Sequence, residues 1–199
     1  MATCASACTP QGDPKLAPGG FTDTFERSEV GSAWNNTGGP YRIISGSLHV
    51  RGARNHPLWL RRRLPHNVRI EFDVRSDTQD GDIKVEIFGD GVSKAESNSY
   101  TATSYVVIFG GWNNRLNVLA RMNEHGTDRV VGPTYPVVPG KTYHMKIERR
   151  DDTIEAWVDE QQLWKMKDPY PLTGRGHDHF AFNNWESDLY FDNLKVEPL

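Results

Sequence analysis

Cysteine is scarce in this sequence, and its two copies, Cys4 and Cys8, both lie near the start of the 199-residue chain. Two cysteines without a nearby histidine are too few for a zinc site, because structural zinc takes four ligands. The pair could close a small disulfide loop, one of the two could carry a lipid anchor, or both could be inert. The long cysteine-free remainder is compatible with an oxidising compartment outside the cytoplasm.

Long hydrophobic runs and an excess of basic residues are also missing. No stretch of about 18 apolar residues occurs, so we expect no transmembrane helix. No basic start followed by an apolar segment occurs, so we expect no signal peptide in this chain. The net charge of −3 argues against a general nucleic-acid binder, which needs basic residues to neutralise phosphates. We expect the one basic run, Arg61–Arg63, to be a solvated strand edge.

Convincing helical patterns are absent, and alternation of apolar and polar residues takes their place. In Val68–Arg75 every second residue is apolar, which is the period of a half-buried strand. Residues 143–148 alternate in the same way, and so do Ile154, Ala156 and Val158, with Trp157 on the opposite face. Further strands are predicted at Tyr41–Val50, Leu58–Leu64, Ile83–Phe88, Tyr105–Phe109, Leu116–Met122, Phe180–Asn183 and Leu189–Val196.

Turn signals separate these segments, among them Ser45-Gly46, Asp80-Gly81, Gly110-Gly111 and Pro139-Gly140. Many short strands at regular spacing indicate an all-β fold, a two-sheet sandwich of antiparallel strands with under about a tenth of its residues helical. The abundant aromatic residues, 6 Trp, 7 Tyr and 8 Phe, are enough to fill its core.

The chain divides into residues 1–20, expected to be a flexible N-terminal tail rich in small and polar residues, and a single domain over 21–199. We expect Phe21–Glu26 to lie beside Leu189–Val196, since pairing the termini protects a sandwich edge. In the second segment the apolar phase slips by one residue at Asp192-Asn193, which predicts a β-bulge.

Several of these motifs resemble one family in their order. They are the opening Phe21–Phe25 followed by Trp34, the Tyr41–Leu48 pattern, the strand Glu71–Arg75 and the closing Phe191–Val196. This order resembles the concanavalin A-like lectin and glucanase superfamily of jelly-roll sandwiches. More narrowly, it is similar to bacterial YesU-like and 3-keto-disaccharide hydrolase-like domains. The resemblance implies a glycan or oligosaccharide as partner and a secreted, periplasmic or cell-surface location, but one fold hosts lectins, hydrolases and lyases alike.

The paired carboxylates of the superfamily's glucanases, in a Glu-x-Asp-x-x-Glu pattern, are absent from this sequence. Glu71, Asp73 and Glu86 come nearest, and we expect them to lie on solvated strand faces. His177 and His179, in the motif Gly-His-Asp-His, could act as an acid and base or bind a metal. Alternatively, both could be polar residues of a turn that leads into Phe180.

The middle of the chain offers the best candidate for a binding surface. The candidate ligand-binding residues are Tyr105, Trp112, Asn113, Arg121, Glu124 and His125. A hairpin would bring them together, and sugars bind by stacking on aromatic rings and by hydrogen bonds to such polar groups. We expect Tyr105, Trp112, Arg121 and His125 to line one exposed groove on the concave sheet, although Trp112 could instead belong to the core.

A structural calcium ion is a further expectation, since many members of the superfamily that this sequence resembles hold one near the chain ends. Asp23 and Asp192 would be its ligands if the terminal strands pair. Three functions remain open: an extracytoplasmic carbohydrate-binding domain, a glycan-active hydrolase or lyase, and a structural or adhesion module. The first needs an aromatic platform, the second also needs two titratable groups in one cleft, and the third needs an exposed apolar patch.

Overall fold

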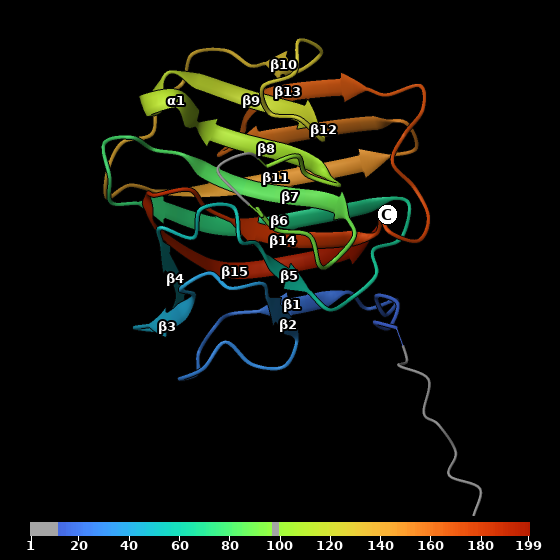
Figure 1. Cartoon of the computed structure of the whole chain (residues 1–199), viewed down its shortest axis with the longest axis horizontal. Coiled ribbons are helices and arrows are strands. Elements are labelled where there is room, and N and C mark those ends of the chain that lie inside the picture. Colours follow the sequence, from blue (N-terminus) through green and yellow to red (C-terminus); the bar gives the residue numbers. More distant parts are fainter. Residues whose placement is uncertain (1–11, 97–99) are drawn as a thin grey trace, which may run out of the picture.

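The structure, a computed structural model, describes residues 12–96 and 100–199, and its regular elements are almost all β-strands. Two antiparallel sheets lie face to face, one in front of the other in Figure 1. This arrangement confirms the predicted two-sheet sandwich. Among the described residues, no helix is both long enough and apolar enough to cross a membrane.

The eight-stranded sheet forms the rear layer in Figure 1. Its order is β13 (Gln161–Lys167), β12 (Thr153–Val158), β11 (Thr142–Arg150), β6 (Val68–Ser76), β15 (Asp188–Pro198), β4 (Ser47–Arg51) and β3 (Arg42–Ile44), and β1 (Phe21–Asp23) also pairs with β15. The seven-stranded sheet has the order β10 (Val130–Val131), β9 (Leu116–Arg121), β8 (Tyr105–Gly110), β7 (Ile83–Gly89), β14 (His179–Asn183), β5 (Leu58–Leu60) and β2 (Trp34–Asn36). A short turn labelled α1 (Gly111–Asn114) joins β8 to β9.

Period-two alternation builds the core between the sheets. In β6 the apolar residues Val68, Ile70, Phe72 and Val74 are buried, and the charged residues between them are partly exposed. At the centre lies Phe182, whose ring contacts those of Phe25, Trp34, Phe72, Phe180 and Phe191. Each such ring removes a large apolar area from water, so this aromatic cluster is a main source of stability.

The chain termini meet as predicted. Strand β1 pairs antiparallel with β15, with Phe21 opposite Val196 and Asp23 opposite Leu194. The register of β15 against β6 shifts between Asp192 and Lys195, which confirms the bulge. Asn193 there has a φ of 51°, the left-handed conformation that a bulge residue often adopts.

Three strands, β2, β10 and β13, were not predicted from the sequence. In β13 the adjacent residues Leu163 and Trp164 are both buried, so its alternation is broken. The cause is a register shift in the pairing of β12 with β13, between Ala156 and Trp157. Strands β2 and β10 are only three and two residues long, too short to show a period.

The segment Asp13–Leu16, which the sequence assigns to the flexible tail, is attached to the domain. The backbone of Leu16 donates to Arg63 and that of Arg63 donates to Pro14, and the Arg61 guanidinium lies 3.1 Å from the Asp13 carboxylate. The basic run Arg61–Arg63 therefore binds this segment. The expectation that the run is only a solvated strand edge is wrong. Residues 1–11, with Cys4 and Cys8, lie outside the described residues.

Replacing Phe182 with alanine should reduce the free energy of unfolding by about 3–5 kcal/mol, because the cavity left in the aromatic cluster cannot collapse completely. Chemical denaturation of the two proteins would measure the difference. Tyr170→Ala is the control, since Tyr170 is 82% exposed and its removal should change stability by under about 0.5 kcal/mol. A loss of less than about 1 kcal/mol in Phe182→Ala would contradict the central position of this ring in the core.

Candidate functional site

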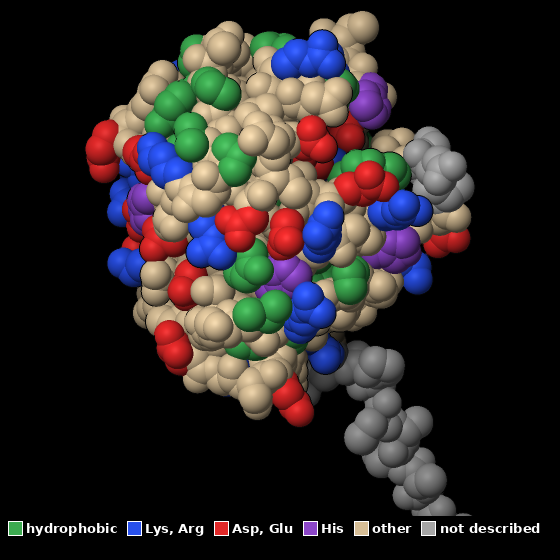
Figure 2. All heavy atoms as spheres, turned by 90° about the vertical axis from the view of Figure 1, so that its left-hand side faces the viewer, with side chains coloured by type: hydrophobic (Ala, Val, Ile, Leu, Met, Phe, Trp, Pro, Cys, Tyr) green, Lys and Arg blue, Asp and Glu red, His purple; other side chains and the backbone are tan. Residues whose placement is uncertain are grey.

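A cleft of about 640 Å³ opens on the outer face of the seven-stranded sheet. This volume lies within the range of about 300–1,000 Å³ that is typical of ligand sites. Acidic side chains gather beside a histidine at the upper right of the face shown in Figure 2. The cleft is lined by Asn55, Asp80, Asp82, Lys84, Tyr100, Thr101, Ile108, Trp112, Asn113, Asn123, Glu124, His125, Trp185, Glu186 and Ser187.

Strand β7 supplies the charged groups beneath this cleft. Alternation sends Ile83, Val85 and Ile87 into the core between the sheets, so Lys84 and Glu86 point to the outer face. Yet both are buried, at 2% and 0% exposure. Burying two charges on one strand is costly unless each is paired or hydrogen-bonded, and both are.

Glu86 is enclosed by hydrogen-bond donors from two segments, the β7–β8 connection and the end of β14. The Tyr100 hydroxyl donates to both of its oxygens, at 2.9 and 3.1 Å, the Ser104 hydroxyl donates to Oε2, and Asn183 Nδ2 donates to Oε1 at 2.7 Å. Burial raises the pKa of Glu86 from 4.5 to about 7, although the hydrogen bonds from Ser104, Tyr100 and Asn183 lower it. The expectation of a solvated Glu86 is therefore wrong, because the β7–β8 connection covers this part of the sheet.

Lys84 is held by Glu124 from the β9–β10 connection. Its Nζ lies 2.8 Å from Glu124 Oε2 and donates to Asn55 Oδ1 at 3.2 Å. Burial alone would lower the pKa of Lys84, but the charges of Asp82 and Glu124 outweigh it and raise the pKa, so the ammonium form persists. Burial raises the pKa of Asp82, and although the charge of Lys84 lowers it, the charge of Glu124 adds to the rise.

Trp112 forms one wall of the cleft from a backbone of unusual conformation. Trp112, Asn113 and Asn114 have φ values of 52°, 57° and 61°, so three successive residues are left-handed. Asparagine tolerates this region, but a bulky residue such as tryptophan does so only at a cost of about 1–3 kcal/mol. Such strain persists only where the surrounding structure holds it, as it does for the left-handed core residues Phe25 and Phe88, and it is frequent at functional sites.

Hydrogen bonds and close packing hold this strained turn in place. Asn114 bridges the backbone of Val137, accepting from its N at 2.8 Å and donating to its O at 2.7 Å. Asn117 Oδ1 accepts from the backbone N of Gly110. Gly110 is itself left-handed, and a Cβ there would lie 2.5 Å from a methyl carbon of Val137, so only glycine fits.

Two side chains fix the Trp112 ring itself. The Arg129 guanidinium lies over the ring at 4.8 Å from its centroid, and Arg129 Nη1 donates to the backbone O of Glu124. The imidazole of His125 packs edge-on against the ring, with centroids 5.5 Å apart. One face of the indole is thus taken by a cation, and Trp112 remains half-buried at the edge of the cleft.

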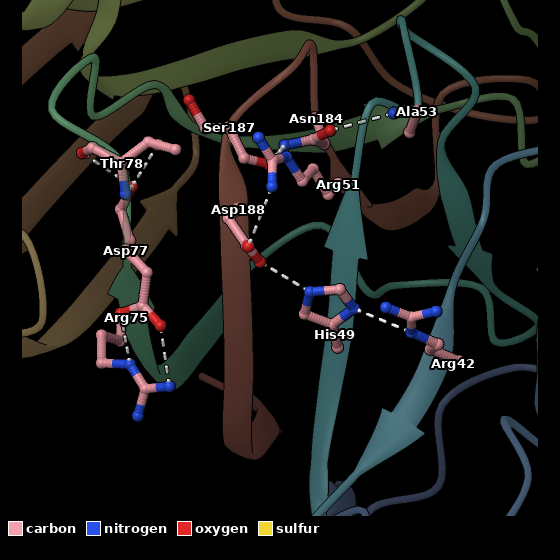
Figure 3. Close-up of polar contacts among 11 residues, drawn as sticks. Arg42, His49, Arg51, Ala53, Arg75, Asp77, Thr78, Asn184, Ser187 and Asp188 are labelled. Carbon is pink, nitrogen blue, oxygen red and sulfur yellow. Dashed lines mark hydrogen bonds and ion pairs between the residues drawn. The ribbon is translucent and has the colours of Figure 1, made fainter.

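Trp185 and Glu186 enter the cleft from the turn between β14 and β15. Fully buried Asn184 anchors this turn, since its Oδ1 accepts from the backbone N of Ala53 and its Nδ2 donates to the backbone O of Ser187 (Figure 3). Behind the turn, Asp188 Oδ1 lies 2.6 Å from Nε2 of buried His49 (Figure 3). The turn is therefore fixed from below and presents its side chains in a defined position.

Four of the predicted binding residues meet in this cleft: Trp112, Asn113, Glu124 and His125. The prediction that Tyr105 lines the same exposed groove is wrong, because Tyr105 is fully buried between the sheets. Arg121 is opposite it in the β8–β9 pairing, and both donate to Asp168 on the far side of the sheet from the cleft. Period two explains the error, since Tyr105 belongs to the inward-facing set of β8.

The two predicted histidines do not form a joint site. His177 Nδ1 lies 2.8 Å from the backbone O of Thr103, whereas buried His179 lies beside Asp178 and Asp13. In residues 12–96 and 100–199 no three His, Cys, Asp or Glu side chains gather closely enough to hold a metal ion. The acid-base or metal role of His177 and His179 stays a prediction.

The surroundings of Asp23 do not fit the expected calcium ion. Both carboxylate oxygens of Asp23 accept from the Arg27 guanidinium, and Oδ2 also accepts from the Trp34 indole at 2.9 Å. A hard cation needs such oxygens free of cationic donors. Asp192 accepts instead from Ser47 and from the backbone of Asn193.

Sequence reasoning missed the part of the cleft that comes from β7 and from the β14–β15 turn. Lys84, Tyr100 and Trp185 were not among the candidates, although Trp185 follows a pair of asparagines much as Trp112 precedes one. Strand alternation predicts that Lys84 and Glu86 share a face, but it does not indicate that connecting segments cover that face.

No protein-family model matches this sequence, and no curated protein matches it either. Several solved structures, in contrast, match the fold of this chain. A carbohydrate-binding module, CBM66, from Bacillus subtilis matches with a TM-score of 0.61 and 15% identity over 85% of this chain and 98% of that one. A protein of unknown function with a galectin-like fold, also from Bacillus subtilis, has a TM-score of 0.68 and 13% identity over 89% and 94%. The alginate lyase Aly36B has a TM-score of 0.59 and 14% identity over 92% and 98%.

These likenesses concern the fold, since all three identities are low. Both a binding module and an enzyme are among the structures with this architecture. The narrower resemblance to YesU-like and 3-keto-disaccharide hydrolase-like domains stays a prediction. The chain shares the two-sheet antiparallel β-sandwich fold of these solved structures.

Proposed function

We propose that this protein is a carbohydrate-binding domain that holds a glycan chain in the cleft on its seven-stranded sheet. The exposed part of the half-buried Trp112 indole would stack on the C–H face of a sugar ring. Asn55, Asn113 and Asn123 would hydrogen-bond sugar hydroxyls, and Trp185 would bound the other side.

The observation that carries this proposal is the strained turn that presents Trp112. A left-handed tryptophan costs stability, and the half-buried indole lies outside the core between the sheets and packs only against the small cluster that includes Val106 and Ile108. The strained conformation is explained if the Trp112 ring contacts a ligand at the surface. The likeness in fold to a carbohydrate-binding module supports the same function.

We further propose that the protein acts outside the cytoplasm, as a secreted, periplasmic or surface-attached domain. Glycan polymers that a cleft of this kind could hold are found mainly outside cells, and the cysteine-free domain is compatible with that location. A lipid anchor through the N-terminal segment remains part of this proposal.

A glycan-active enzyme is the second candidate, and Glu86 is the reason to consider it. A carboxyl group with a pKa of about 7 could exchange protons near neutral pH. However, Glu86 is fully buried, does not line the cleft, and its oxygens already accept from Tyr100, Ser104 and Asn183. This enclosure favours a structural role for Glu86 and binding over catalysis.

Trp112→Ala should weaken glycan binding about tenfold, the effect of losing roughly 1.4 kcal/mol of stacking energy. A glycan array would first identify ligands, and calorimetry would then compare the wild-type and variant proteins. The matched control is Trp157→Ala. Trp157 is also half-buried with a cation on its ring, Lys146 at 4.3 Å, but it lies on the outer face of the other sheet.

Equal losses in Trp112→Ala and Trp157→Ala, or no loss in either, would refute the assignment of the cleft. Unfolding of Trp112→Ala would show that the indole is core. Trp112→Gly separates these cases, because glycine relaxes the left-handed turn and should preserve the fold while removing the stacking surface.

The buried Glu86 should make the protein less stable as the pH rises. Its pKa of about 7 in the folded state exceeds the ordinary value of 4.5, so the folded state binds the proton more tightly. Below pH 4.5 both states are protonated and there is no penalty. Between pH 4.5 and 7 the free energy of unfolding should fall, by up to about 3 kcal/mol at 1.36 kcal/mol per pH unit.

Glu86→Gln should remove this part of the pH dependence, because glutamine does not titrate. Denaturation curves of both proteins at several pH values from 4 to 8 would give the difference directly. If the free energies of unfolding of wild type and Glu86→Gln differ by the same amount at every pH, the pKa of Glu86 is not raised in the folded state. Loss of a glycan-cleaving activity in Glu86→Gln, with binding preserved, would instead favour the enzyme.

A further inference from the structure

Of the described residues that line the candidate cleft, one is a lysine, and it is deeply buried there. The side chain of Lys84 is only 3% exposed, although it lines the cavity. Alone, an ammonium group at the bottom of a cleft would attract anionic ligands such as uronic acids, the carboxylated sugars. The class of glycan that can bind therefore depends on whether the Lys84 ammonium group is free to pair with a ligand.

Glu124 neutralises this lysine. Its Oε2 lies 2.8 Å from Lys84 Nζ, and the other oxygen, Oε1, lies 3.6 Å from His125 Nε2. Arg129 fixes the same stretch of backbone through its bond to the Glu124 carbonyl. The carboxylate is thus held in place over Lys84, in a partly buried environment where screening by salt is weak.

Among the described residues, the other charged side chains that line the cleft, His125 apart, are acidic. Asp80 and Asp82 stand on the segment leading into β7, and Glu186 stands on the opposite turn, where Arg54 approaches it at 3.1 Å. The Asp82 carboxylate lies close enough to Lys84 for the two charges to attract each other. With Lys84 neutralised, a carboxylate on a ligand would face like charge here, which is a strong form of discrimination.

We infer that Glu124 is a specificity-determining residue, which by masking Lys84 makes the cleft select uncharged glycans over glycans that carry carboxylates. The inference rests on the proposed glycan-binding function. It predicts that the site gains affinity for acidic glycans when Glu124 loses its charge, because Lys84 then becomes free to pair with a uronate. Asp82 remains nearby in that case and limits the gain.

The test compares oligosaccharides that differ only in the carboxyl group. Suitable pairs are β-1,4-mannohexaose with hexamannuronate, and methyl-esterified with de-esterified hexagalacturonate. Binding to wild type, Glu124→Gln and the double variant Lys84→Met/Glu124→Gln would be measured by calorimetry at low salt. Thermal unfolding of each variant would establish that it is folded, and the double variant leaves no unpaired ammonium buried.

Wild type should bind the neutral member of any pair it recognises at least tenfold more tightly. Glu124→Gln should shift the ratio at least tenfold towards the acidic member, and the double variant should lose this shift because the ammonium is gone. A wild-type preference for the acidic member, or an unchanged ratio in Glu124→Gln, would overturn the inference. Binding that depends on Trp112 but ignores ligand charge would defeat this inference alone, whereas failure to bind any glycan would defeat the proposed function with it.

Discussion

The burial of Lys84 and Glu86 on the outer face of one central strand is the constraint on which the site depends. Two charged side chains beneath a protein surface must be paired and hydrogen-bonded, or the sheet would lose stability. Glu86 is satisfied by Tyr100, Ser104 and Asn183, and Lys84 by Glu124 and Asn55. Four of these partners come from the β4–β5, β7–β8 and β9–β10 connections, and Asn183 ends β14. Meeting this requirement draws the connections over the sheet and leaves a polar cleft between them.

The aromatic walls of the cleft are held by a second set of local restraints. The strained Gly110–Asn114 turn is fixed by Asn114 and Asn117, and the turn with Trp185 is fixed by Asn184. Asparagine side chains suit this task, because each carries both donors and an acceptor and can replace missing backbone partners. The protein thus combines a regular core with irregular connections that polar side chains determine, and the candidate function lies in those connections.

Period-two alternation made the fold predictable from sequence. The same rule could have corrected part of the prediction of the site residues. The strand β6, the pairing of β1 with β15 and the bulge after Asp192 all follow from the positions of apolar residues. Applied to β8, alternation assigns Tyr105 to the core together with Phe109. The burial of Glu86 could not be predicted in this way, because it depends on how long connections fold over the sheet. Strand β13 was missed for a similar reason, since a register shift hides its period.

The central claim is that a glycan occupies the cleft beside Trp112 and Trp185, and the six indole N–H signals in a nitrogen–proton correlation spectrum test it most directly. Trp34, Trp59 and Trp164 are buried, and Trp157 lies on the other sheet, so these four signals serve as internal references. On titration with a glycan selected from an array, the signals of Trp112 and Trp185 should move together along one binding curve while the other four stay in place. Movement of the Trp157 signal without that of Trp112 would place the binding surface on the opposite sheet and contradict the account.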